Sequence, residues 1–203
     1  MAECAAIILA AGQAARYRAA GGMEASKLVA DVGGMPMVRH VAIAALASTA
    51  RPVLVVTGHA QREVASALVG LAVQLVHNPD FVTGMASSLK AGVAALPLGA
   101  PGAVILLADM PSVQAALIDR LAQALASRAD AIAAVPVFAG KRGNPVALAA
   151  SLFAAVGKLS GDEGARKLLT DAARVVEVAV EDACVTLDID TPEALTALRD
   201  RSG

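Results

Sequence analysis

Aromatic residues are almost missing from this chain. Its 203 residues include one tyrosine, three phenylalanines and no tryptophan, which together make up 2% of the sequence. The hydrophobic set nevertheless reaches 57%, above the roughly 45–50% of ordinary globular chains. Alanine supplies most of the excess, so we expect an aliphatic core, and low charge with high apolarity argues against disorder. The length fits one domain.

Cysteine, histidine and excess charge are also scarce. Cys4 and Cys184 form neither a disulfide framework nor a metal cluster, and we interpret both as reduced core residues. The three histidines lie far apart and form no HExxH pair. With 17 basic and 18 acidic residues, the chain lacks the basic stripe that nucleic-acid-binding domains carry. Because this basic stripe is missing, we do not expect nucleic acid as a partner.

A membrane span and a secretory signal are not expected either. The longest charge-free stretch, residues 91–108, is interrupted by glycines and prolines, which divide it into a helix end, a loop and a strand. The first residues contain no basic segment before their apolar run. We therefore expect a cytoplasmic protein.

Short apolar runs alternate with helix-period segments along the first two thirds of the chain. This rhythm predicts an α/β fold with a mostly parallel sheet between two layers of helices. The expected strands are 4–10, 52–57, 72–77, 103–108 and 130–135, and the expected helices are 37–48, 60–69, 85–96 and 112–127. Pro36 suits the first turn of the first helix, and Ser112 is a candidate cap of the last.

The rhythm changes after Val135. Gly140 and Gly143 lie between two β-like runs and predict a hairpin with a polar tip. Two short helices, near 151–157 and 163–171, and two strands, 174–180 and 184–187, are expected next, and Thr191 would cap a final helix. No linker or repeat is visible, so we expect residues 1–203 to form a single domain.

The segment after the first strand carries the first chemical signal. Small residues follow Leu9, and at the end of a strand they let backbone N–H groups surround a phosphate. Arg16 and Lys27 follow the Gly12 turn, with Arg18 as a further cation, which suits a polyphosphate. A flexible loop with solvated cations is the alternative. The GxGxxG and GxxxxGK[ST] phosphate loops are both absent.

Acidic residues supply the second signal. Asp109 follows a predicted central strand, so its carboxylate would face the crevice where α/β sheets bind ligands and would suit Mg²⁺. Capping of the next helix is the alternative. Asp188 and Asp190 follow another predicted strand and complete the metal site if the two strands are neighbours. A purely structural turn explains them nearly as well.

Together the motifs resemble the MobA-like nucleotidyltransferase family, most closely its molybdenum cofactor cytidylyltransferases (MocA type). Leu9–Gly12 with Arg16 and Lys27 is similar to the family signature LAAGxSxRxGxxK. The segment 78–92, NPDFVTGMASSLKAG, resembles NPxxxxGMxxSLxxG. The remaining motifs follow in the family's order: 108–111 (ADMP), 142–145 (RGNP), 161–166 (GDEGAR) and 188–193 (DIDTPE).

The resemblance implies a three-layer, Rossmann-like fold of the nucleotide-diphospho-sugar transferase (GT-A-like) kind. It implies transfer of CMP from CTP to the terminal phosphate of molybdopterin, with release of pyrophosphate and with Mg²⁺ as cofactor. Residues 1–135 would bind the nucleotide and 136–203 the acceptor, and a client molybdoenzyme is the implied partner. The implied catalytic residues are Arg16, Lys27 and Asp109; the nucleotide-binding residues are Leu9, Ala10, Ala11, Gly12, Asn78, Gly84 and Ser87; the acceptor-binding residues are Arg142, Gly143, Asn144, Asp162 and Arg166; and the metal ligands are Asp109, Asp188 and Asp190.

Ala11 decides the expected base. LAAG resembles the cytidylyltransferases and LAGG the guanylyltransferases, and the extra methyl group would crowd a purine, which favours CTP. The chain departs from the family pattern at Ala14, at Tyr17-Arg18 and at Asn144. Those departures leave other functions open. The alternatives are a transferase for a sugar or methylerythritol phosphate and a non-catalytic pterin carrier. A purely structural interpretation of the acceptor residues is an ordinary hairpin tip together with an Asp162–Arg166 helix ion pair.

Overall fold

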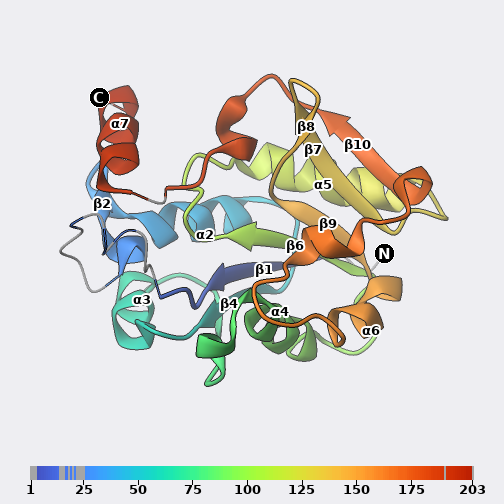
Figure 1. The fold of residues 1–203 in the computed structure, drawn as a ribbon, viewed down its shortest axis with the longest axis horizontal. Helices are drawn as coiled ribbons and strands as arrows, with labels where there is room; N and C mark the ends of the chain where they lie inside the picture. The colour runs from blue at the N-terminus through green and yellow to red at the C-terminus, as the bar shows by residue number, and fades with distance from the viewer. Residues whose placement is uncertain are drawn as a thin grey trace.

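A single mixed sheet organises the computed structural model, which describes residues 4–13, 17, 19, 21, 26–189 and 191–202, the last five by their backbone alone. The strand order is β10-β7-β9-β6-β1-β4-β5, with β8 paired to the free part of β7 (Figure 1). The strands are β1 (Ala5–Ala10), β4 (Val53–Thr57), β5 (Gln74–His77), β6 (Gly102–Leu107), β7 (Ala133–Phe138), β8 (Lys141–Arg142), β9 (Val146–Ala149) and β10 (Val175–Ala179).

Most neighbouring strands in this sheet are parallel. β5, β4, β1 and β6 run parallel to one another, and β10 runs parallel to β7. β9 is antiparallel to both β6 and β7, so it separates two parallel groups that point the same way. The predicted mostly parallel sheet is therefore confirmed, and the carboxyl ends of β1, β4 and β6 meet at one edge.

Helices cover both faces of the sheet, because successive strand residues point to opposite sides. Ala6 and Ile8 of β1 pack with α2 (Met37–Ala47), α3 (Gln61–Ala67) and α5 (Ala115–Ser127). Ala5 and Ile7 pack on the other face, with α4 (Met85–Ala94) and α6 (Phe153–Val156). The result is the expected three-layer arrangement with an aliphatic core.

The carboxyl edge carries a smaller third cluster. The short hairpin of β2 (Asp31–Val32) and β3 (Met35–Pro36) lies beside the distant helix α7 (Pro192–Ser202), as Figure 1 shows. Val32, Met37, Ile189 and Leu195 are buried together there. This cluster ties the end of the chain to the segment that follows β1.

Several predicted local features are confirmed. The hairpin forms between β7 and β8, where Ala139 (φ 47°) and Gly140 (φ 76°) make a two-residue turn with positive φ at both positions, as right-twisted hairpins favour. Thr191 does begin the last helix: its Oγ1 accepts a hydrogen bond from the Ala194 N–H at 3.2 Å. Pro36 lies one residue before α2 rather than in its first turn.

Two further predictions about local structure are wrong. Residues 184–187 are not a strand, because the 3₁₀ helix η6 (Ala183–Thr186) occupies this stretch and the Asp182 carboxylate caps it by accepting from the Cys184 N–H at 2.8 Å. Ser112 does not cap α5, since Gln114 is the residue before that helix. In each case a local turn determines the backbone conformation, and apolar patterning or the capping preference of a residue does not.

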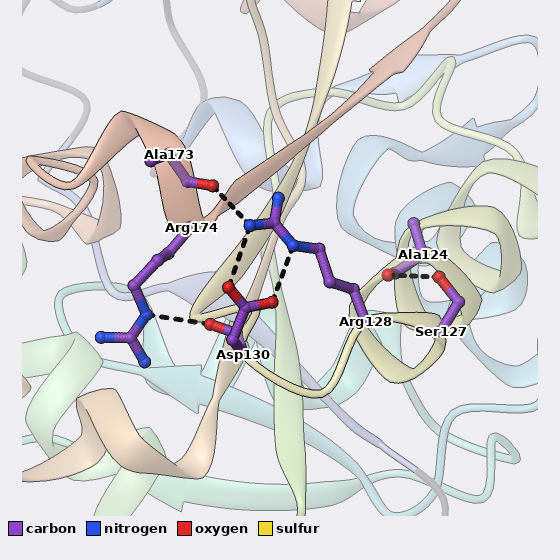
Figure 2. A network of polar contacts seen from close by, with 6 residues as sticks. All are labelled: Ala124, Ser127, Arg128, Asp130, Ala173 and Arg174. Carbon is purple, nitrogen blue, oxygen red and sulfur yellow. Dashed lines mark hydrogen bonds and ion pairs between the residues drawn. The ribbon is translucent and has the colours of Figure 1, made fainter.

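The opposite, amino edge of the sheet is held by a polar network shown in Figure 2. The Arg128 guanidinium binds the Asp130 carboxylate through two N–H···O bonds of 2.8 and 3.0 Å and donates to the Ala173 carbonyl at 2.6 Å. Arg174 donates to the Asp130 carbonyl at 2.9 Å. The network joins the end of α5, the approach to β7 and the start of β10.

No helix within the described ranges has both the length and the apolar composition that crossing a membrane requires.

Candidate functional site

A cavity of about 610 Å³ opens at the carboxyl edge of β1 and β6. This volume lies within the roughly 300–1,000 Å³ typical of small-molecule sites. Residues from six segments line it: Leu9, Ala11, Gly12, Gln13 and Tyr17; Lys27 and Leu28; Phe81, Val82, Gly84, Met85 and Ser88; Leu107 and Asp109; Asp162; and Asp188. The parallel strands bring segments far apart in the sequence to this one place.

Lys27 and Asp109 form an ion pair inside the cavity. Their Nζ and Oδ2 atoms are 2.7 Å apart, and the two side chains are only 11% and 19% exposed. Lys27 begins the 3₁₀ helix η1 (Lys27–Val29), which is capped by Ser26, and Asp109 lies just beyond the end of β6. The structure therefore joins two residues that the sequence predicted as separate signals, and Asp109 is not the cap of the next helix.

Asp188 reaches the same cavity although no strand precedes it. The loop after η6 is fastened to the Asp109 loop by a hydrogen bond of 3.1 Å from the Ile189 N–H to the Asp109 carbonyl. Within the ranges described, no three acidic, histidine or cysteine side chains are close enough together to hold a metal ion. Asp109 and Asp188 supply two carboxylates, and Mg²⁺ usually takes one or two of these together with substrate phosphates and water, so the donor set fits that ion.

Two predicted residues lie outside the described part of the chain: Arg16, a predicted catalytic residue, and Asp190, the alternative metal ligand. The predicted nucleotide-binding residues in and after β1 lie among the described residues. Leu9, Ala11 and Gly12 line the cavity, whereas Ala10 is buried in the strand. The small residues that follow β1 thus lie at the cavity.

Asn78 and Ser87 bind the protein itself. Asn78 is 3% exposed. Its Nδ2 donates to the hydroxyl oxygens of Ser87 (2.8 Å) and Ser88 (3.0 Å), and its Oδ1 accepts from the Asp80 N–H at 3.0 Å. Of the two serines it is Ser88 that lines the cavity. The sequence analysis missed Ser88, which follows Ser87 on α4.

Gly84 lines the cavity and contacts Gly161, which belongs to a distant segment of the chain. Its φ is 107°, and a Cβ atom there would overlap the carbonyl group of Gly161. The Ala86 N–H donates to the same carbonyl at 3.0 Å. The next residue, Asp162, therefore faces the cavity from a segment that belongs to the last third of the chain.

The other predicted acceptor-binding residues do not line this cavity. Arg142 on β8 donates from Nε to Glu177 Oε1 at 2.8 Å. A Cβ at Gly143 would overlap the Val185 carbonyl, and the Asn144 N–H donates to that carbonyl at 2.8 Å. Arg166 is exposed on the 3₁₀ helix η4 (Ala165–Leu168). Arg142, Gly143 and Asn144 thus tie the hairpin to β10 and η6.

The predicted helix ion pair between Asp162 and Arg166 does not form. Asp162 precedes η4 and is not on a helix, and within the described residues the ion pair here joins Lys167 and Glu163, at 3.4 Å. Asp162 therefore lines the cavity without an ion pair to the described residues.

Phe81 is a further residue that the sequence analysis missed. A Cβ at Gly58 would come within 2.6 Å of Phe81 Cβ and 2.8 Å of Ala11 Cβ, so the bare Gly58 backbone is required for both to pack at the end of β4. The Phe81 ring lines the cavity and lies 6.0 Å from the His59 ring between centroids. A glycine directly after a buried strand was the available signal.

Neither cysteine has the character of a nucleophile. Burial raises the pKa of the Cys4 thiol, and burial together with the Asp182 carboxylate raises the pKa of Cys184 to about 11. A thiol with so high a pKa is almost fully protonated near neutral pH. Both cysteines are free in the structure, as the sequence predicts.

Comparison with known proteins identifies the family. Residues 6–178 match the family described as the MobA-like NTP transferase domain. The purine catabolism protein PucB of Bacillus subtilis is 38% identical over 125 residues, which cover 59% of this chain and 58% of PucB; the match therefore spans little more than half of that relative.

Solved structures share the fold over nearly the whole chain. Rv0371c of Mycobacterium tuberculosis is 25% identical with a TM-score of 0.80, and the match covers 98% of each chain. A nucleotidyl transferase from Methanothermobacter is 26% identical with a TM-score of 0.82, over 98% of this chain and 97% of that one. The predicted Rossmann-like fold is confirmed, and the chain belongs to the MobA-like NTP transferase domain family.

Proposed function

We propose that the chain is a Mg²⁺-dependent nucleotidyltransferase that transfers CMP from CTP to the terminal phosphate of molybdopterin and releases pyrophosphate. The observation that carries the proposal is the Lys27–Asp109 ion pair inside the cavity. It puts a cation for a phosphate and a carboxylate for a metal ion side by side. Transfer of a nucleotidyl group requires that combination, because catalysis rests on positioning and on neutralising charge.

The turn after β1 would bind the triphosphate. Leu9, Ala10, Ala11 and Gly12 supply the strand end and the turn, and Gly12 is exposed with open space around its Cα. Backbone N–H groups of such turns bind phosphate oxygens. Arg16 would bind the β- and γ-phosphates, and Lys27 the α-phosphate.

Asp109 would hold Mg²⁺, with Asp188 or Asp190 as the second carboxylate. When bound, the ion neutralises phosphate charge and orients the phosphates. The hydrogen bond from Ile189 to the Asp109 carbonyl supports this pairing, because it fixes one loop against the other.

The reaction needs no covalent intermediate with the protein. An oxygen of the acceptor's terminal phosphate attacks the α-phosphorus, a new P–O bond forms, and the bond to the β-phosphate oxygen breaks so that pyrophosphate leaves. Lys27 would stabilise the negative charge that develops on the α-phosphate oxygens. The raised pKa of both thiols agrees with a mechanism that uses no cysteine.

The choice of CTP rests on Ala11. This residue is 3% exposed, lines the cavity and packs at the Gly58 backbone together with Phe81. Its methyl group fills space next to the cavity that a glycine would leave open, which favours the smaller pyrimidine ring. Asn78 and Ser87 would act here by fixing the position of Ser88.

The acceptor is assigned to the last third of the chain. Arg142, Gly143, Asn144, Asp162 and Arg166 remain the proposed acceptor set, and Asp162 is the member that lines the cavity. A client molybdoenzyme that receives the product is the partner that this activity implies.

The test is pyrophosphate release by the full chain with Mg²⁺ and molybdenum cofactor, measured with CTP and GTP in parallel. We expect release with CTP. Release with GTP alone would keep the transferase and overturn the choice of base. Release only when a sugar or methylerythritol phosphate replaces the molybdenum cofactor would overturn the acceptor, and tight pterin binding without nucleotide binding would identify a carrier.

A further inference from the structure

Two neighbouring acids in the segment after α6 have different surroundings. Glu163 is engaged within the protein: its Oε2 accepts from the Ser160 N–H at 3.1 Å, and its Oε1 lies 3.4 Å from Lys167 Nζ. Asp162 is exposed, lines the cavity and makes no hydrogen bond or ion pair with the described residues. Asp162 therefore lines the cavity and has carboxylate oxygens that no described residue occupies.

Backbone contacts fix the place of this carboxylate. Gly161 lies against Gly84 so closely that a Cβ on Gly84 would overlap its carbonyl, and the Ala86 N–H binds the same carbonyl. One step further, a Cβ at Gly164 would come within 2.8 Å of the Met85 Sδ. The segment carrying Asp162 can approach the start of α4 because Gly84 has no Cβ, and the flexible Met85 side chain packs against Gly164.

The walls of the cavity differ in charge. Lys27, Asp109 and Asp188 provide the charged side chains for phosphates and metal. The wall made by Ala11, Phe81, Val82, Gly84, Met85 and Ser88 has no charged side chain of its own. The residue before Asp162, Gly161, contacts Gly84 of this uncharged wall. Among the described residues, Asp162 does not form a metal-binding group with Asp109 and Asp188. A free carboxylate also repels phosphate.

The uncharged wall suits a nucleobase, and a carboxylate beside it can distinguish bases. An ionised carboxylate only accepts hydrogen bonds. Cytosine presents an exocyclic N4 amino donor where uracil presents the O4 acceptor. An aspartate at that position therefore binds the first base and repels the second.

We propose that Asp162 selects the nucleobase by accepting a hydrogen bond from the exocyclic amino group of cytosine. The assignment moves Asp162 from the acceptor set to the nucleotide site. It rests on the proposed nucleotidyl transfer and explains how a segment from the last third of the chain contributes to nucleotide choice. Gly84 then acts as a positioning residue, since it lets Gly161 approach.

The first test compares CTP with UTP. Calorimetry with Mg²⁺ on the full chain measures binding without any acceptor, and pyrophosphate release with molybdenum cofactor gives kcat/KM for each nucleotide. Asp162→Asn can donate as well as accept, so we expect the CTP:UTP preference to fall by about tenfold or more. The KM for the acceptor should not change. Glu163→Gln is the matched control, because its amide oxygen still accepts from Ser160 and the preference should remain.

Gly84→Ala provides a second, independent variant. It leaves the carboxylate intact and moves the segment that carries it, so the preference for CTP should fall here too. Gly99→Ala is its control, since Gly99 also has a positive φ, 81°, but open space around its Cα. Both proteins are compared after their folding is verified by circular dichroism.

The outcomes separate this inference from the proposed function. Preference for CTP that disappears in Asp162→Asn, without any pyrophosphate release from molybdenum cofactor, supports base selection and overturns the transfer to molybdopterin. An unchanged CTP:UTP ratio in Asp162→Asn with a raised KM for the acceptor overturns the inference and returns Asp162 to the acceptor set. Wild-type protein that binds CTP no more tightly than UTP also overturns it.

Discussion

Two acid–base pairs at opposite edges of the same sheet differ in almost everything except their chemistry. Arg128 and Asp130 precede β7 at its amino end, and their side chains are 42% and 60% exposed. Lys27 and Asp109 meet beyond the carboxyl end of β6, where their side chains are 11% and 19% exposed. Because β6 and β7 point the same way, the two pairs lie at opposite edges.

The difference lies in what else each pair can bind. Figure 2 shows that the Arg128 guanidinium is directed at Asp130 and the Ala173 carbonyl, while Arg174 binds the Asp130 carbonyl. That network connects segments of the chain. The Lys27–Asp109 pair instead lines a cavity of about 610 Å³. An ion pair that lines a cavity is a candidate functional group. An exposed ion pair whose members also hydrogen-bond backbone carbonyls serves local structure.

Removing the carboxylate of the cavity pair should have the largest effect. Asp109→Asn keeps the size of the side chain but loses the charge that would hold Mg²⁺, so pyrophosphate release should fall by about 10³-fold or more. Asp130→Asn is the matched control, because it makes the same change in the exposed pair and should leave turnover unaltered. Normal turnover in Asp109→Asn would refute the assignment of Asp109.

The lysine of the cavity pair should have the next largest effect. Lys27→Met keeps the length of the side chain and removes its charge, so the charge that develops on the α-phosphate is no longer neutralised. We expect kcat to fall by about 10²-fold with a smaller change in the KM for CTP. A higher KM at constant kcat would instead mean that Lys27 binds the ground state and the transition state equally.

Much of the fold follows from the sequence because strand and helix periods are local. The Val/Ile-rich runs of β1, β4 and β6 are buried on both faces and are detected by composition alone. The stretch 184–187 has similar composition, but it is short and is preceded by Asp182, whose carboxylate caps a 3₁₀ turn. Apolar composition cannot distinguish these two cases.

The site is predictable where it depends on strand ends. Asp109 reaches the crevice because it follows β6, and Leu9, Ala11 and Gly12 reach it from the end of the neighbouring parallel strand β1. The contact between Gly84 and Gly161 joins segments far apart in the sequence and depends on backbone geometry, so no local pattern could place Asp162. The same holds for Arg142, whose partner Glu177 is on a different strand.

Asn78 tests whether a polar residue near the cavity binds ligand or supports the site. Its amide is buried and bonded to Ser87, Ser88 and the Asp80 N–H, so Asn78→Ala removes these three bonds, although the Ser87 hydroxyl still donates to the Asp80 and Gly84 carbonyls. We expect a loss of about 1–3 kcal/mol in unfolding free energy and a melting temperature lower by roughly 2–12 °C. A raised KM for CTP with an unchanged melting temperature would instead identify Asn78 as a direct nucleotide ligand.

The exposed pair should give the smallest effect, and one that depends on pH. The hydrogen bond from Arg128 holds the pKa of the Asp130 carboxyl below its usual range. Because the pKa is lowered in the folded protein, the stabilisation is present above about pH 4, the unfolded value, and is lost as the pH falls through the folded pKa. Asp130→Asn cannot titrate there.

The melting temperatures of wild type and Asp130→Asn should therefore differ slightly at pH 7 and converge below about pH 4. High salt should reduce the difference at pH 7, because exposed charges are screened. Turnover should be equal in the two proteins at every pH at which both are folded. A loss of turnover in Asp130→Asn would show that the amino edge also contributes to activity, and the contrast between the two pairs would then fail.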